Sequence, residues 1–126
     1  MNKQGELGEQ YAAKYLTGMG YEIISQNFHT PYGEIDIIAS KDEYICFVEV
    51  KTRSKNSIAR PAAAVNVKKQ QKIIKSAMIY LSQNCCDFQP RFDVIEVITS
   101  NTEKFSVEKL VFLEGAFIIN EANRCD

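Results

Sequence analysis

The sequence predicts an α/β fold, in which two helices flank a central mixed β-sheet within one domain covering residues 1–126. Three observations support this class. Helical and strand-like hydrophobic periods alternate along the chain, two central segments are apolar on both faces, and no linker is long enough to divide the 126 residues. At this length, folding buries roughly two-thirds of the unfolded chain's surface, which is enough for one core.

The first helix is predicted at residues 5–19, because apolar side chains recur there at steps of three and four residues. The stripe consists of Leu7, Tyr11, Tyr15, Leu16 and Met19. Gly18 and Gly20 end the helix. Glu9 falls at the edge of the stripe, so we expect its carboxylate to point toward the body of the domain.

Three strands are predicted next, at residues 21–28, 34–39 and 44–52. The turn residues at 29–33 separate the first two strands, and the short polar segment 40–43 makes the second and third an antiparallel hairpin. Both hairpin strands are apolar on two faces over part of their length. They are therefore expected at the centre of the sheet, covered on both sides.

The second helix is predicted at residues 66–82, with Asn66 as its N-cap. Its apolar face comprises Val67, Ile73, Ile74, Ala77, Met78 and Leu81. Lys68, Lys69, Lys72 and Lys75 cluster on the opposite side. Strands at 92–99 and 105–113 complete the sheet, and residues 116–119 fit either a strand or a loop.

Charge is nearly balanced overall, with 15 Lys and Arg against 16 Asp and Glu, which alone argues against a nucleic-acid-binding protein. The distribution is uneven, since residues 51–75 contain eight basic and no acidic side chains. These are Lys51, Arg53, Lys55, Arg60, Lys68, Lys69, Lys72 and Lys75. A solvated surface is one interpretation, but helix lysines without interleaved glutamates favour contact with the phosphates of a nucleic acid.

Charged residues within the central strands indicate a candidate functional site. Alternation places Glu49, Lys51 and Arg53 on one side of their strand, and a hairpin that closes around residues 41 and 42 brings Asp36 close to Glu49. Two carboxylates held together in a half-buried place repel each other and destabilise the fold unless a cation lies between them.

Oxygen ligands of this kind suit Mg²⁺ or Mn²⁺, which also bind phosphate oxygens. Lys51, on the same face, could orient or activate an attacking water and neutralise charge that grows on a phosphorus centre. This set of residues predicts metal-assisted hydrolysis of a phosphodiester. The residues alone also allow a buried ion-pair network of Asp36, Glu49 and Lys51 without a metal.

The segments Gly33–Ala39 and Phe47–Arg53 closely resemble the YraN-like family of small, largely uncharacterised bacterial proteins. That family is similar to archaeal Holliday junction resolvases and to the wider PD-(D/E)xK nuclease superfamily. The resemblance extends over nearly the whole chain, including Gly8 with Glu9, Lys69 with Gln70, and Arg91–Val94. It implies a restriction-endonuclease-like αβββαβ core.

The resemblance also implies roles for individual residues. Asp36 and Glu49 would ligate Mg²⁺ or Mn²⁺ with help from the Val50 carbonyl, Lys51 would be the catalytic lysine, and Glu9 would be an accessory acid. The implied substrate is DNA, with branched or junction DNA included. Because junction resolvases work as dimers, the resemblance further implies a homodimer.

These residues are compatible with three functions. The first is a magnesium-dependent endonuclease whose segment 51–75 guides the phosphate backbone. The second is a non-catalytic nucleic-acid-binding module that keeps the fold and the basic face. The third is a protein-interaction domain whose acidic remainder engages a basic partner. We expect a cytoplasmic protein without a membrane segment, because no export signal and no apolar run of about 18 residues is present.

The remaining reactive side chains are assigned to structure. The cysteines, at positions 46, 85, 86 and 125, form no Cys-x-x-Cys pair, so we expect reduced thiols and no zinc site. His29 is assigned to surface structure. Arg91 and Asp93 share a side of their strand and are expected to form a local ion pair.

Overall fold

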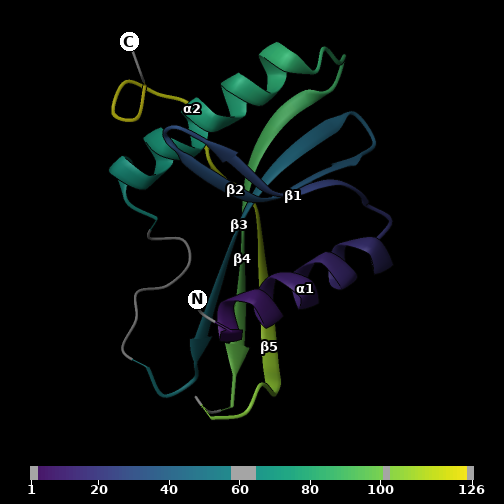
Figure 1. Ribbon diagram of the computed structural model, residues 1–126, viewed down its shortest axis with the longest axis vertical. Coiled ribbons are helices and arrows are strands. Elements are labelled where there is room, and N and C mark those ends of the chain that lie inside the picture. Colours follow the sequence, from purple (N-terminus) through teal and green to yellow (C-terminus); the bar gives the residue numbers. More distant parts are fainter. Residues whose placement is uncertain (1–2, 58–64, 101–102, 125–126) are drawn as a thin grey trace.

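The computed structural model describes residues 3–57, 65–100 and 103–124. Within these residues, two helices and five strands follow one another in the order αβββαββ (Figure 1). They are α1 (Lys3–Gly18), β1 (Glu22–Thr30), β2 (Gly33–Lys41), β3 (Tyr44–Ser54), α2 (Val67–Gln83), β4 (Gln89–Thr99) and β5 (Val107–Phe117).

The strands form one sheet in the order β1-β2-β3-β4-β5. Neighbouring strands are antiparallel except β3 and β4, which are parallel because α2 carries the chain back to the starting edge of the sheet. The predicted α/β class with a mixed sheet is confirmed, and this arrangement is consistent with a restriction-endonuclease-like core.

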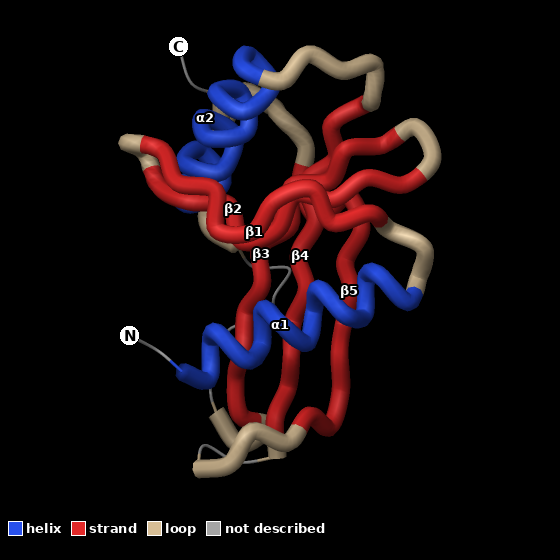
Figure 2. Tube along the Cα trace, turned by 45° about the vertical axis from the view of Figure 1, so that its right-hand side comes forward, coloured by secondary structure: helices blue, strands red, loops and turns tan. Residues whose placement is uncertain are grey.

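The two helices lie on opposite faces of the sheet (Figure 2). Under α1, the buried side chains include Leu16, Ile37, Ala39, Val48, Ile95 and Val97. Under α2, they include Ile38, Ile45, Phe47, Ile73, Ala77 and Phe92. The hairpin strands β2 and β3 contribute to both clusters, which explains why their sequences are apolar on two faces.

Helix α1 presents a different face to the sheet from the one predicted. Its buried residues are Gly8, Ala12, Ala13 and Leu16. Tyr11 and Met19, which were expected inside, are 40% and 48% exposed. The small residues allow a close approach, and a Cβ atom on Gly8 would overlap the hydroxyl group of Thr52. The start of α1 therefore lies directly on β3.

Helix α2 begins as predicted, with the Asn66 side chain accepting a hydrogen bond from the Lys69 N–H at 2.8 Å. The assignment of Val67 and Met78 to its apolar face is wrong, because both are exposed. Tyr80 is buried instead and packs edge-on against Phe28 and Phe47. The hairpin of β1 and β2 packs along this side of α2, so the buried face of the helix is turned toward it (Figure 1).

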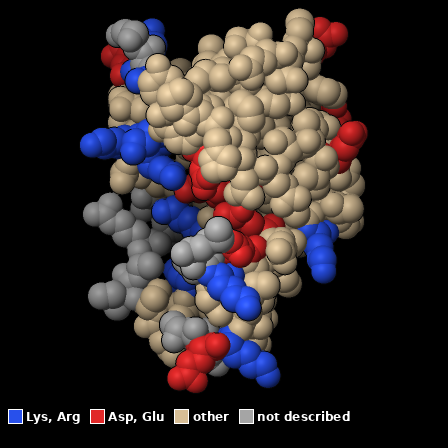
Figure 3. Space-filling view, viewed as in Figure 1, with Lys and Arg blue, Asp and Glu red and all other residues tan. Residues whose placement is uncertain are grey.

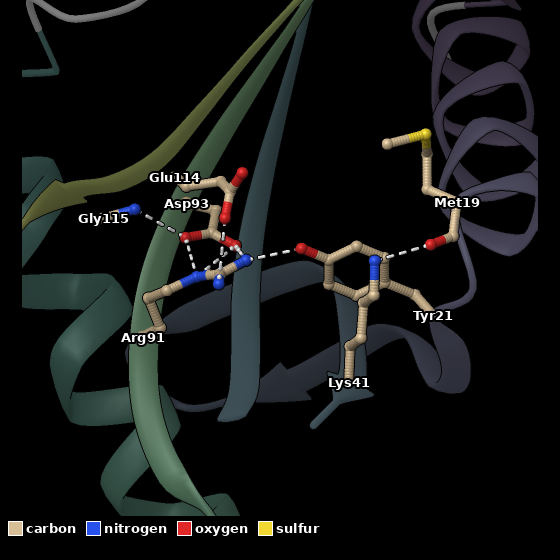
Figure 4. A network of polar contacts seen from close by, with 7 residues as sticks. All are labelled: Met19, Tyr21, Lys41, Arg91, Asp93, Glu114 and Gly115. Carbon is tan, nitrogen blue, oxygen red and sulfur yellow. Dashed lines mark hydrogen bonds and ion pairs between the residues drawn. The ribbon is translucent and has the colours of Figure 1, made fainter. Parts of the chain in front are cut away.

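A polar network attaches the turn between α1 and β1 to the sheet (Figure 4). The predicted ion pair of Arg91 and Asp93 is confirmed, with Nη2 of Arg91 2.9 Å from Oδ2 of Asp93. The same nitrogen donates to the Tyr21 hydroxyl at 2.7 Å, and Lys41 donates to the Met19 carbonyl at 2.7 Å. The network joins β4 to the start of β1.

Cys46 lies in β3 as a buried thiol, and burial raises its pKa to about 12. Cys85 and Cys86 are free and exposed, whereas Cys125 lies outside the described residues. His29 is a surface residue as predicted, with Nδ1 3.2 Å from Oε2 of Glu34. Among the described residues, neither helix has the length and apolar character needed to cross a membrane.

Candidate metal and nucleic-acid site

The candidate site lies where β2 leaves β3. The two strands pair from Lys41 opposite Tyr44 to Ile37 opposite Val48, and their pairing then ends. Strand β2 nevertheless remains paired with β1 as far as Gly33. The outer part of the β1–β2 hairpin therefore diverges from the sheet toward α2 (Figures 1 and 2).

Asp36 is the first residue of β2 beyond this pairing. Its Oδ2 accepts a hydrogen bond from the Val50 N–H at 2.8 Å. If the pairing continued, Ile35 would lie opposite Val50 and its carbonyl oxygen would accept the Val50 N–H. The Asp36 carboxylate takes the place of that backbone acceptor. Because the N–H and C=O of one strand residue point the same way, the Val50 carbonyl faces the same opening.

Glu49 meets Asp36 at this opening. The two carboxyl groups share a hydrogen bond, and their side chains are shielded from solvent, with Asp36 7% exposed as a residue and the Glu49 side chain 11% exposed. Burial raises the pKa of Asp36 from 3.8 to about 8, and the negative charge of Glu49 adds to the rise. The structure thus brings together the two acids that the sequence placed on neighbouring strands.

Glu9 reaches the same region from α1. Burial raises its pKa, and the charges of Glu34 and Glu49 raise it further. The Asn27 side chain forms a hydrogen bond with the Glu9 carboxylate, which partly opposes this rise. Sequence reasoning missed Asn27 and Glu34 as neighbours. A signal for Glu34 exists in the sequence, because it lies two residues before Asp36 and strand alternation places both side chains on the same face.

Lys69 has a different position from the one expected of a phosphate contact. Its Nζ lies 3.5 Å from Oε2 of Glu49, and its side chain is 42% exposed. The lysine comes from the first turn of α2, so this ion pair ties the start of the helix to β3. Glu49 is therefore shared between the carboxyl group of Asp36 and the ammonium group of Lys69.

Lys51 lies two residues beyond Glu49 on β3 and is exposed. Strand alternation places both side chains on the same side. Within the described part of the chain, Lys51 forms no ion pair with either carboxylate. Its ammonium group is accordingly available to a ligand that approaches the exposed side of the site.

The other basic residues divide into two groups. Arg53 pairs with Glu96 at 2.6 Å and Lys55 with Glu108 at 2.9 Å, so the structure does not leave them as unpaired cations. Arg60 lies outside the described residues. The lysines of α2 that are exposed and form no ion pair with the described residues are Lys68, Lys72 and Lys75. Figure 3 shows acidic side chains near the middle of one face, with Lys and Arg side chains beside them on the side of α2.

The residues of this site fit a hard divalent cation. The donors are the carboxylates of Asp36 and Glu49 and the carbonyl oxygen of Val50, a set that consists of oxygen alone. The Asp36 carboxyl group, whose pKa is raised by burial and by the negative charge of Glu49, lies in an environment that a cation would stabilise. Among the described residues, no group of three or more metal-ligating side chains occurs, so Mg²⁺ or Mn²⁺ would retain several waters.

Comparison with known proteins identifies the relatives of this chain. Residues 8–97 match the model of the uncharacterised protein family UPF0102. A UPF0102 protein of Caldanaerobacter subterraneus subsp. tengcongensis is 47% identical, covering 90% of this chain and 93% of its own. A UPF0102 protein of Clostridium acetobutylicum is 44% identical, with 93% and 95% covered. The chain therefore belongs to the uncharacterised protein family UPF0102, the YraN-like family that its central strands resemble.

Proposed function

We propose that this protein is a metal-dependent endonuclease that hydrolyses phosphodiester bonds in DNA, including branched or junction DNA. One observation carries the proposal. Asp36 of β2 and Glu49 of β3 converge where the two strands separate, and both are largely buried. The exposed Lys51 lies beside them on β3. Such an arrangement is costly for stability, and acids with a raised pKa, as Asp36 has, cluster at functional sites.

Each residue has a role that follows from its position. Asp36, Glu49 and the Val50 carbonyl would hold Mg²⁺ or Mn²⁺. When bound, the cation would act as a Lewis acid toward a phosphate oxygen. The exposed ammonium group of Lys51 would contact the phosphate and stabilise the charge that develops during attack. Glu9, held by Asn27, would position a water at the edge of the site.

The first turn of α2 supports a phosphate partner. It contains Lys68 and Lys69 and no acidic residue, although cations near a helix N-terminus are electrostatically unfavourable. The same charges add to the positive end of the helix dipole and attract anions. With Lys72 and Lys75 further along, α2 would guide the phosphate backbone toward Glu49.

The direct test is incubation of the purified protein with supercoiled plasmid and a four-way DNA junction, with Mg²⁺ or Mn²⁺. We expect cutting in both metals and none in EDTA. Glu49→Ala and Lys51→Ala should each lower the cutting rate at least 100-fold, as expected for loss of an electrostatic contact to the reacting group, while DNA binding survives. Lys109→Ala, an exposed lysine on β5, is the matched control and should cut normally.

A non-catalytic nucleic-acid-binding module is the second candidate. The observation that favours it is the Lys69–Glu49 pair, because this lysine already provides Glu49 with a cation. DNA binding with a steep salt dependence, but no cutting with either metal, would select this alternative over the endonuclease.

We also propose that the protein acts in the cytoplasm. We propose that it acts as a homodimer, because cutting both strands of a junction requires two active sites. Light scattering of the purified protein during size-exclusion chromatography measures its mass directly. A mass of twice 14.3 kDa is expected. A mass of one chain, both free and bound to a junction, would contradict the homodimer.

A further inference from the structure

A groove lies between the tip of the β1–β2 hairpin and helix α2. It has a volume of about 410 Å³ and is lined by Pro31, Tyr32, Lys68, Gln71, Lys72 and Lys75. The three charged side chains in its lining are all lysines. The groove therefore combines an aromatic ring with three positive charges on the same helix as Lys69 of the candidate site.

Tyr32 is 50% exposed, its ring contacts Lys75, and hydrogen bonds hold the backbone of the hairpin tip in place. Lys75 Nζ lies 4.9 Å from the ring centroid, and the Tyr32 N–H donates to the Thr30 hydroxyl at 3.1 Å. That hydroxyl is 2.8 Å from the Ser76 hydroxyl on α2, which fixes the hairpin tip on the helix. An exposed ring in a fixed position loses little conformational entropy when a flat ligand stacks on it.

Nucleic acid is the ligand class that matches both parts of the groove. Unpaired bases stack on aromatic side chains, and the phosphates between them pair with lysines. Bases within an intact duplex are stacked on one another and cannot reach a protein ring without leaving the helix. A tyrosine beside a row of lysines therefore selects for a strand that has unpaired bases.

The spacing relates this groove to the candidate site. Lys75 follows Lys69 by six residues, which is about 9 Å along a helix axis. A stacked strand advances about 3.4 Å per nucleotide, so this distance corresponds to roughly two or three nucleotides. A base on Tyr32 would therefore lie a few nucleotides from the phosphate beside Glu49.

We infer that Tyr32 stacks on an unpaired base of a DNA strand whose phosphates follow Lys68, Lys72 and Lys75. The inference rests on the proposed function and narrows its substrate to DNA with a single-stranded segment next to the cut. It assigns to the hairpin tip a binding role that is separate from metal binding and from catalysis.

The test measures binding in EDTA, so that cutting plays no part. A labelled 15-nucleotide poly(dT) strand and a 15-base-pair duplex are titrated with protein at fixed salt, and anisotropy is recorded. We expect Tyr32→Ala and Tyr32→Leu to weaken poly(dT) binding by about 5- to 150-fold, the range for loss of one stacked base. Tyr32→Phe should remain within about twofold, because phenylalanine keeps the aromatic face.

Two comparisons make the result specific. Tyr11→Ala removes another exposed tyrosine, on α1, and should leave poly(dT) binding unchanged. Duplex binding should be nearly equal for the wild type and Tyr32→Ala, whereas Lys72→Ala should weaken both ligands. A thermal melt of each variant confirms that it is folded.

Three outcomes would overturn the inference, and they are distinguishable. Normal poly(dT) binding by Tyr32→Ala, with weak binding by Lys72→Ala, would exclude stacking and leave the proposed function standing. Equal losses for poly(dT) and duplex would exclude selection of unpaired bases. Absence of binding to either ligand by the wild-type protein would overturn both this inference and the proposed function.

Discussion

The Asp36 carboxylate occupies the place of a backbone acceptor on β3, since its Oδ2 accepts the Val50 N–H at 2.8 Å. The side chain thereby caps β3 at the point where β2 diverges. This bond lowers the pKa of Asp36, but burial and the charge of Glu49 outweigh it. The same geometry that ends strand pairing therefore places two acids together where a cation would stabilise them.

Metal-free stability should depend on pH through Asp36. Its pKa is raised from 3.8 to about 8, so the folded state keeps a proton that the unfolded state has lost in this window. The contribution of Asp36 to the free energy of unfolding should be greatest below about pH 4. It should fall by about 2 kcal/mol or more as the pH rises toward 8. Urea unfolding in EDTA at several pH values measures this fall. Asp36→Asn should reduce it, and an unchanged pH dependence in that variant would contradict the assignment.

Divalent cations should stabilise the protein and compete with Lys69. We expect Mn²⁺ or Mg²⁺ to raise the melting temperature of the wild type, because a ligand that binds only the folded state stabilises it. Lys69→Ala removes the resident cation beside Glu49 and should tighten metal binding about two- to fivefold, as loss of a partly exposed ion pair predicts. Calorimetric titration measures the affinity.

The control for this comparison is Lys68→Ala, which removes an exposed lysine from the same helical turn. Its metal affinity should equal that of the wild type. A metal affinity that weakens in Lys69→Ala would show that this lysine supports the cation instead of competing with it.

Gly8→Ala should destabilise the protein by about 1–3 kcal/mol, because the new Cβ would overlap the Thr52 hydroxyl at a tight helix–strand contact. Adding Thr52→Ala should restore part of the loss, since it removes the overlapping oxygen. Gly18→Ala, at the other end of the same helix, meets no neighbouring atom within 4 Å and should not destabilise the fold. Urea unfolding of the four proteins measures these differences. Equal effects of the two glycine substitutions would refute the contact.

Arg91→Ala should cost about 3–5 kcal/mol of stability, since it leaves the fully buried Asp93 side chain without its cation. Lys55→Ala breaks an exposed pair with Glu108 and should cost at most about 1 kcal/mol. Both values come from denaturant unfolding at pH 7. If the two substitutions had the same effect, the network of Figure 4 would not anchor the turn between α1 and β1.

Much of the fold could be predicted from local pattern. The strands of the central hairpin, the Asn66 cap and the approach of Asp36 to Glu49 all follow from hydrophobic period and a short turn. The face of α1 could not, because the residues that decide it are Gly8 and Ala12, which carry a weak hydrophobic signal. Their effect depends on the shape of the strand beneath them.

The end of the sheet shows a similar limit. Strand β5 was predicted to end at residue 113, but it continues to Phe117 through Gly115, which has a φ of 59°. A glycine in a left-handed conformation usually indicates a turn, whereas here it accompanies an irregularity in the pairing with β4. Residues 118 and 119 lie beyond the strand.

Within the candidate site, the sequence predicted which side of β3 each residue faces, but it did not predict the ion pair between Lys69 and Glu49. Alternation fixes which side a strand residue faces. The approach of Lys69 to Glu49 depends on where α2 begins in space relative to β3, and a single sequence does not encode that distance in any local pattern.

The hairpin of β1 and β2 has two mechanically different parts. Near Lys41 it is continuous with β3 through backbone bonds, whereas beyond Ile37 it is joined to the remainder of the protein by side chains such as Asp36 and Thr30. The position of the outer part therefore depends on its side-chain contacts with α2 and β3, including the buried Ile35, and not on backbone pairing with β3. Any substitution that detaches the hairpin tip from α2 should expose Asp36 and Glu49 to water together, because the same packing shields both acids.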